Sequence, residues 1–239
     1  MLYPPGFFGL QLASARKMTR LAQQSYPEAI LYGTAMYRIL GLDWSLDPHH
    51  PTWQSYLRGL HQEDTDANWS YQFYLEYADQ ILSYNKPRWG CFSYEYWTEK
   101  RVIHLHFANL DGSGYGPLSH WRKEARLAEL WSMFTHIKRA HPAATAVHGS
   151  SWLYNLEAYR RLFPIEYVCS ARADAPHLMA RSLWGQFLRH DGQLNEERAS
   201  LFFHRLSQLQ EEHQHAQCFP YQVLLTKAPI TLFYDFYGI

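Results

Sequence analysis

A glycine-rich segment between residues 111 and 117 is the part of this sequence whose spacing best suggests chemistry. It runs from Asp111 to Pro117, with glycine at residues 112, 114 and 116, between an apolar, β-branched segment and a long helical pattern. Such a loop can present backbone N–H groups at a helix N-terminus, where the helix dipole adds about half a positive charge. The segment therefore predicts a site for an anion, usually a phosphate. A tight turn that uses glycine for positive φ is the alternative interpretation.

The 14 histidines of the chain raise the question of a metal site. His104 and His106 lie two residues apart on a predicted strand, so their side chains share one face. A third ligand from His120, His136 or a carboxylate would be needed, because zinc takes three or four converging ligands. No third ligand follows at motif spacing, so we expect no metal.

The first third of the sequence has helical periodicity. Proline and glycine bracket a predicted helix from Glu28 to Leu40, and two others are predicted over Leu10–Gln24 and Asp66–Leu82. After residue 86 the period changes to the alternation of a β-hairpin, which extends to Ala108. We therefore expect a mainly helical portion over residues 1–85.

Helices and strands are mixed in the remaining sequence. The strongest predicted helix, Ser119–Ala140, has an apolar stripe that includes Leu127, Phe134 and Ile137. The other predicted elements are, in chain order, a strand over Ala144–Gly149, a helix over Trp152–Phe163, a strand over Ile165–Ala171, helices over Pro176–His190 and from the N-cap Asn195 to about His213, and strands over Phe219–Lys227 and Ile230–Phe236. This order predicts an α/β fold, with a mixed central sheet flanked by helices, as a single domain over residues 1–239.

Composition excludes several classes of protein. Hydrophobic residues make up 47% of the chain and charged residues 18%, which excludes a disordered chain. Lys plus Arg equals Asp plus Glu at 22 each, so nucleic acid is not an expected partner. The basic group Arg122, Lys123 and Arg126 is interpreted as a solvated helix face.

The three cysteines have no paired spacing, which favours reduced thiols. The sequence shows neither a signal-peptide pattern at its start nor an apolar run long enough to span a membrane. We therefore expect a soluble, cytoplasmic protein without a membrane partner.

The order of predicted elements from about Trp89 to Ala171 resembles that of the GNAT N-acetyltransferase superfamily. In that family a β-hairpin precedes a loop with the pattern Gln/Arg-x-x-Gly-x-Gly/Ala, followed by a long helix, a strand, a shorter helix and another strand. Gly114 and Gly116 match the glycines of this pyrophosphate loop. The segment 158–164, with the sequence AYRRLFP, resembles the family's Leu-Tyr-x-x-Leu-Gly-Phe motif. The fold implied by the resemblance is GNAT-like.

The activity implied by the resemblance is transfer of an acyl group from an acyl-CoA donor to the amine of a small molecule or peptide. A homodimer is one assembly that the protein could form. Tyr159, at the tyrosine of the second motif, would protonate the departing thiolate. The CoA diphosphate would bind the loop backbone, with Arg122 one turn into the helix; the loop residues are Gly112, Ser113, Gly114, Tyr115 and Gly116.

Acyl transfer also needs a base that deprotonates the amine. His148, at the end of a predicted strand, is a candidate because imidazole titrates near pH 6.5, and Glu95 on the hairpin is a second. Each candidate has a simpler interpretation. Tyr159 fits a packed aromatic of an amphipathic helix, and His148 fits a hydrogen-bonded loop residue.

Asp111 departs from the family pattern, because it places a negative charge where the family has glutamine or arginine. Two like charges at 4 Å repel by about 1 kcal/mol in water and by more in a drier site. The sequence therefore also favours a second class, a non-catalytic binding or interaction protein of GNAT-like architecture. A His-ligated metalloprotein is the third class.

Overall fold

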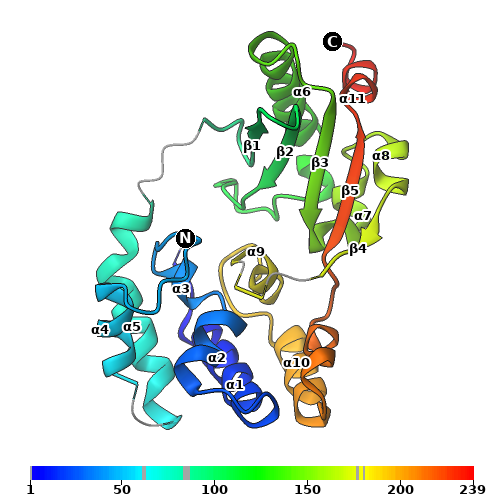
Figure 1. Cartoon of the computed structure of the whole chain (residues 1–239). Coiled ribbons are helices and arrows are strands. Elements are labelled where there is room, and N and C mark those ends of the chain that lie inside the picture. The colour runs from blue at the N-terminus through cyan, green and yellow to red at the C-terminus, as the bar shows by residue number, and fades with distance from the viewer. Residues whose placement is uncertain (1, 61–62, 83–86, 176–177, 180) are drawn as a thin grey trace. The chain divides into compact units, whose positions relative to one another are not determined.

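The computed structural model describes residues 2–60, 63–82, 87–175, 178–179 and 181–239. Contacts divide the chain into two compact units (Figure 1). Unit 1 comprises Met1–Tyr84 with Pro176–Pro220, and unit 2 comprises Asn85–Ala175 with Tyr221–Ile239. The predicted boundary at residues 85 and 86 and the start of the predicted helix Pro176–His190 lie outside the described residues. That the chain is a single domain stays a prediction.

Unit 1 is built from helices, as the sequence predicts for the first third of the chain. It also takes in residues 176–220, which the sequence assigns to the sheet portion. Its elements are the α-helices α1 (Pro5–Leu21), α2 (Tyr26–Gly33), α3 (Met36–Ile39), α4 (Pro51–Arg58), α5 (Glu63–Leu82), α9 (Arg181–Trp184) and α10 (Glu196–Gln208), and the 3-10 helices η3 (Gly185–Phe187) and η4 (Glu212–Cys218). The predicted N-cap of α10 is confirmed, since the Asn195 side chain accepts a hydrogen bond from the Arg198 N–H at 3.1 Å.

Within the described residues, unit 2 contains a five-stranded mixed sheet (Figure 1). The strand order is β1-β2-β3-β5-β4; β2 and β3 are parallel, and the other neighbouring pairs are antiparallel. The strands are β1 (Phe92–Trp97), β2 (Val102–Phe107), β3 (Ala146–Ser151), β4 (Arg172–Ala173) and β5 (Leu224–Pro229), and the helices are η1 (His120–Arg122), α6 (Lys123–Ala140), η2 (Trp152–Asn155), α7 (Glu157–Arg160), α8 (Ile165–Cys169) and α11 (Ile230–Tyr237). The predicted α/β fold with a mixed sheet flanked by helices is confirmed.

The strand register sorts the side chains of unit 2 onto two faces of the sheet. Ile103, Val147 and Ala228 form one row across β2, β3 and β5, and the next residue on each strand points to the opposite face. Buried side chains of α6, α7, α8 and α11 join the first row in one hydrophobic core. The row on the opposite face is polar and consists of Glu95, His104, His148 and Lys227.

Two segments that the sequence predicts as strands are helices. Ile165–Ala171 contains α8, and Ile230–Phe236 lies within α11. Their β-branched and aromatic composition is typical of strands, but the spacing of the buried residues in α11 is helical. Ile230, Phe233 and Tyr237 pack on the same core at i, i+3 and i+7. Burial on one helix face therefore overrides strand propensity.

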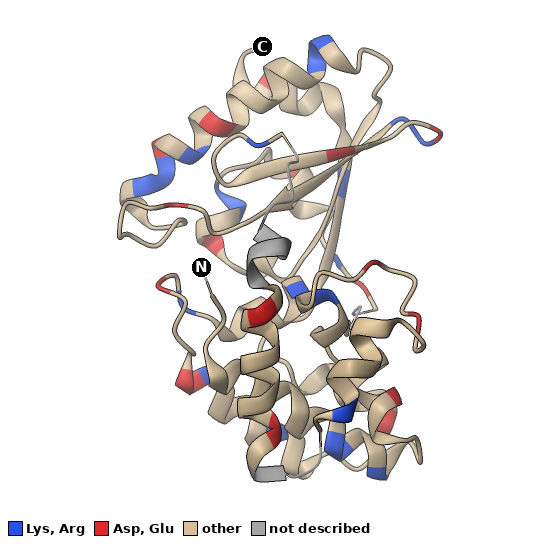
Figure 2. Cartoon of the chain, turned by 90° about the vertical axis from the view of Figure 1, so that its left-hand side faces the viewer, with Lys and Arg blue, Asp and Glu red and all other residues tan. Residues whose placement is uncertain are grey.

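Charges of both signs are interspersed along the chain (Figure 2). On α6, for example, the sequence places Lys123 and Arg126 close to Glu124 and Glu129. None of the helices in the described part of the chain has the length and apolar character needed to cross a bilayer.

His215 joins the segment 176–220 to the N-terminal helices of unit 1. Its Nε2 lies 2.7 Å from the Ser14 hydroxyl of α1, and both side chains are buried. Burial lowers the pKa of His215 from its ordinary value of 6.5 to about 4. The folded protein therefore keeps this imidazole neutral at neutral pH.

This depressed pKa makes stability depend on pH. Between pH 6.5 and about 4 the unfolded chain binds a proton at residue 215 that the folded chain does not. The contribution is full above pH 6.5 and is lost as the pH falls toward 4, by about 3 kcal/mol at 1.36 kcal/mol per pKa unit. Denaturant unfolding of parent and His215→Gln at pH 7 and pH 4.5 measures the difference. Equal pH dependence in the parent and in His215→Gln would refute the role of His215.

Candidate functional site

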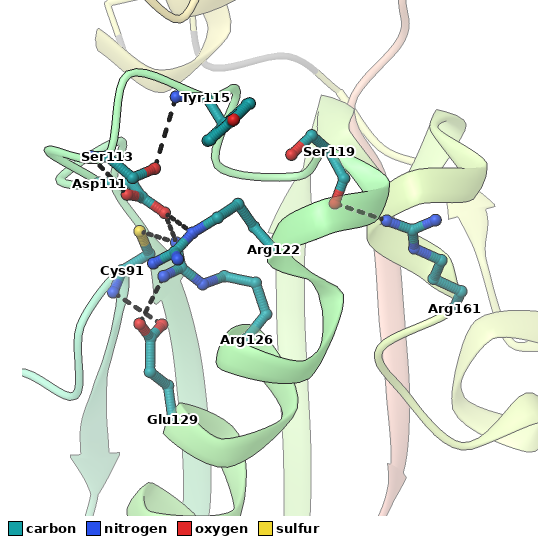
Figure 3. Close-up of polar contacts among 9 residues, drawn as sticks. All are labelled: Cys91, Asp111, Ser113, Tyr115, Ser119, Arg122, Arg126, Glu129 and Arg161. Atoms are coloured by element: carbon teal, nitrogen blue, oxygen red, sulfur yellow. Dashed lines mark hydrogen bonds and ion pairs between the residues drawn. The ribbon is translucent and has the colours of Figure 1, made fainter.

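The carboxylate of Asp111 is the centre of the loop that joins β2 to α6 (Figure 3). Its Oδ1 accepts a hydrogen bond from the Ser113 N–H at 2.9 Å, and its Oδ2 lies 2.6 Å from Arg122 Nε and 3.1 Å from Arg126 Nη1. The Asp111 side chain is 2% exposed. Hydrogen bonds from Ser113, together with Arg122 and Arg126, hold the pKa of Asp111 far below its ordinary value. Asp111 is thus a fully charged carboxylate that faces two guanidinium groups.

Arg126 links this loop to the start of the sheet. Its Nη1 lies 2.6 Å from Cys91 Sγ, and its Nη2 lies 2.6 Å from Glu129 Oε1. The other oxygen of Glu129 accepts a hydrogen bond from the Cys91 N–H at 3.0 Å. Because the Arg126 side chain is 3% exposed, its interpretation as part of a solvated helix face is wrong. The spacing of Arg122 and Arg126, one helical turn apart, is the sequence signal for their shared contact.

The structure favours glycine at one position of the loop and does not require it at another. Gly114 has a φ of 81°, which favours glycine, so the tight-turn interpretation holds there. Gly112 has no positive φ, and an added Cβ would meet nothing within 4 Å. The Ser113 N–H is bound to Asp111, and the Tyr115 N–H donates to Ser113 Oγ at 3.4 Å, a long hydrogen bond. Residues 112 to 115 are exposed.

The end of the loop is braced from the second motif of the sequence. Arg161, which follows α7, donates from Nη2 to the carbonyl oxygens of Leu118 and Ser119 at 3.0 Å each. Figure 3 shows the bond to Ser119. These two bonds fix the chain just before η1 and α6. The segment that resembles the family motif therefore has a clear structural role in positioning the loop.

The parallel strands β2 and β3 separate before they end. Their pairing runs from Val102 and Ala146 to His104 and His148, although β2 continues to Phe107 and β3 to Ser151. Beyond His104 and His148 each strand is paired only on its outer side, β2 with β1 and β3 with β5. The facing backbone edges of residues 105–107 and 149–151 are therefore not paired with each other.

The two candidate bases, His148 and Glu95, lie in the same polar row of the sheet. His104 stands between them in the register, so they are about 10 Å apart, twice the strand spacing. Burial, then Lys227, Lys100 and Arg172, lowers the pKa of His148, which keeps its imidazole neutral at pH 7. Glu95 Oε2 lies 3.7 Å from His106 Nε2.

The candidate acid, Tyr159, lies on the opposite face of the sheet. Its side chain is 2% exposed, and its ring packs at 5.6 Å from Phe107 and 5.1 Å from Tyr154. Burial raises the pKa of Tyr159 well above its ordinary value. Tyr159 therefore satisfies the packed-aromatic interpretation, and its ring also adjoins the end of β2 where the strands separate.

Gly149 is a residue of this region that the sequence does not single out. A Cβ on Gly149 would lie 2.0 Å from the Tyr154 hydroxyl and 2.4 Å from that of Tyr167, which are themselves 2.6 Å apart. Only glycine allows this tyrosine pair to lie against β3. The pair therefore packs directly against the backbone of β3 at Gly149.

The histidines do not form a metal centre among the described residues. No group of three or more His, Cys, Asp or Glu side chains there is arranged to hold an ion. His104 and His106 share a face, as predicted, with ring centroids 4.9 Å apart. Burial, then His106, lowers the pKa of His104 to about 4. The His104 imidazole is thus neutral at pH 7. In the described part of the chain, the two histidines lack a third converging ligand.

A scan against protein-family models found no matching model, and searches of curated proteins and of solved structures found no significant match.

The ion cluster predicts a large effect of removing Arg126. Arg126→Met keeps the length of the side chain but leaves Asp111 and Glu129 without their shared buried cation. We expect unfolding free energy to fall by about 3 to 5 kcal/mol, the usual result when a buried charge loses its partner. Arg139→Met, the same change at an exposed position of α6, should change it by less than about 1 kcal/mol. Equal denaturant midpoints for the two variants would contradict a stabilising role of the cluster.

Proposed function

We propose that the protein is a GNAT-like acyltransferase that moves an acyl group from a CoA-type thioester to an amine. The observation that carries the proposal is the early end of the pairing between β2 and β3, with the glycine loop at the end of β2. The order of β-hairpin, glycine loop, long helix, parallel strand and short helix over residues 92–160 is the order in which the family builds its acyl-CoA half.

The unpaired edges suit the arm of the donor. Pantetheine is an extended chain with two amide groups, and it would pair with the open backbone edges at residues 105–107 and 149–151. The diphosphate end would then lie toward the exposed glycine loop that follows β2. Backbone pairing recognises the arm without any particular side chain, which fits a site with few conspicuous motif residues.

The two faces of the sheet would serve the two proton transfers. A thioester between these edges is open on one side to the polar row with His148 and Glu95, and on the other to Tyr159. His148 or Glu95 would take the proton of the amine, and Tyr159 would give its proton to the departing thiolate. The neutral imidazole of His148 and the protonated phenol of Tyr159 are the forms that these roles need.

The second candidate function is a non-catalytic binding or interaction protein with the same architecture. Asp111 favours it, because the carboxylate already takes the Ser113 N–H and both arginines. Large exposed apolar side chains near the loop, Leu110, Tyr115 and Trp121, favour it as well. This candidate predicts a protein partner and no effect of CoA.

Binding of CoA separates the two candidates. A ligand that binds only the folded state stabilises it by about 2.7 kcal/mol at a concentration of 100 Kd. We expect a saturable rise of the melting temperature with CoA and acetyl-CoA in scanning calorimetry. An unchanged melting temperature at millimolar concentrations would remove the acyltransferase proposal.

Turnover tests the residue roles. With acetyl-CoA and an amine acceptor, Tyr159→Phe should lower kcat severalfold or more while the Kd for CoA stays within about twofold, because the change removes one hydroxyl from the packed ring. Tyr234→Phe, at a partly buried tyrosine of α11, is the matched control and should leave both constants unchanged. If Tyr159→Phe turns over as fast as the parent, Tyr159 is not the acid.

A further inference from the structure

The contacts of Asp111 are those that a phosphate oxygen makes in an anion site. One carboxylate oxygen accepts a backbone N–H of the glycine loop at 2.9 Å, and the other lies 2.6 Å from Arg122 and 3.1 Å from Arg126. A loop N–H and guanidinium groups before a long helix are the usual donors to a ligand phosphate. In this chain the anion in that position is the chain's own side chain.

The charges of the cluster are balanced without a ligand. Two guanidinium groups, Arg122 and Arg126, face two carboxylates, Asp111 and Glu129, so the sum is zero. A phosphate that entered beside Asp111 would meet a negative charge at close range, and like charges repel.

The cluster nevertheless has more donors than the two carboxylates use. The Nε of Arg126, a residue that is 2% exposed, is buried and has no hydrogen-bond partner within the described part of the chain. An unmet buried N–H is costly, and a phosphate or diphosphate offers more acceptor oxygens than a carboxylate. Arg126 thus keeps one buried donor that neither carboxylate uses.

We propose that Asp111 is the specificity-determining residue of the donor site. Its carboxylate fills the position that a phosphate would take, so the site selects a donor by its pantetheine arm and not by its diphosphate. This inference rests on the proposed function for the donor arm. The arm binds between β2 and β3. The Asp111 carboxylate already occupies the position in the loop that the diphosphate would take. The site consequently distinguishes little between CoA and a pantetheine that lacks the diphosphate.

Asp111→Asn tests the proposal directly. The amide keeps the size of the side chain and an oxygen for the Ser113 N–H, but it removes the charge and leaves the cluster with a net positive charge. The probes are inorganic pyrophosphate, CoA and pantetheine, titrated calorimetrically into parent and variant, with circular dichroism as the check of folding. We expect pyrophosphate to bind Asp111→Asn at least about tenfold more tightly than the parent, a difference of about 1.4 kcal/mol.

The donor probes give the second readout. The parent should bind CoA and pantetheine with affinities within about threefold of each other, and Asp111→Asn should favour CoA by at least about tenfold. Glu129→Gln is the matched control, because it changes the charge of the same cluster equally but leaves Asp111 on the loop N–H. It should not create binding of pyrophosphate or a preference for CoA.

The outcomes separate this inference from the proposed function. If Asp111→Asn folds but binds pyrophosphate no better than the parent, or if the parent already prefers CoA over pantetheine tenfold, the role of Asp111 is refuted. If Asp111→Asn binds pyrophosphate while neither CoA nor pantetheine binds any variant, the role of Asp111 as an internal anion stands and the acyltransferase proposal falls. Should Asp111→Asn not fold, Asp111→Ser, which keeps an acceptor oxygen for the Ser113 N–H, is held to the same results.

Discussion

The ion pairs of Asp111 with Arg122 and Arg126 are the interaction on which the rest of the site depends. They close the loop on itself, fix where α6 begins, and through Glu129 and Cys91 hold that helix to the start of β1. Charges buried to this degree are costly unless they are paired, so the cluster specifies one loop conformation and resists alternatives. A ligand of the loop meets an arrangement that is already fixed.

The same loop leads out of the strand whose pairing ends early. β2 and β3 are parallel only as far as His104 and His148, and the loop and η2 carry the chain away from the two diverging strands. Beyond these residues the facing backbone edges are not paired with each other, with a polar row on one face of the sheet and a tyrosine-rich core on the other. On the core side, the Tyr154–Tyr167 hydroxyl pair packs against Gly149 of β3.

Periodicity and turn chemistry predict much of this fold from the sequence. The hairpin, the long helix after the glycine loop, β3 and the Asn195 cap all have local signals, because apolar spacing and capping residues act over a few positions. The helices α8 and α11 have no such local signal in the sequence. Their β-branched and aromatic residues suit strands, and only packing against the core of unit 2 decides for helix.

The site is less predictable, for reasons that are also physical. The sequence singles out Asp111, Arg122 and Arg126. It does not predict that the carboxylate turns inward or that Arg126 is buried, because both depend on the distant residues Cys91 and Glu129. Strand register, a long-range property, places Glu95 and His148 in one row and Tyr159 on the other side of the sheet. The addition of residues 176–220 to the N-terminal unit likewise has no local signal.

We expect the donor arm to bind along residues 105–107 and 149–151 while Asp111 keeps the Ser113 N–H. Backbone NMR of the isotope-labelled protein during a titration with CoA measures both. Saturable shifts of residues 105–107 and 149–151, with the Ser113 amide and the Asp111 carboxyl carbon unchanged, are the expected result. Shifts confined to other parts of the chain, or a Ser113 amide that moves as far as residues 105–107, would refute this arrangement.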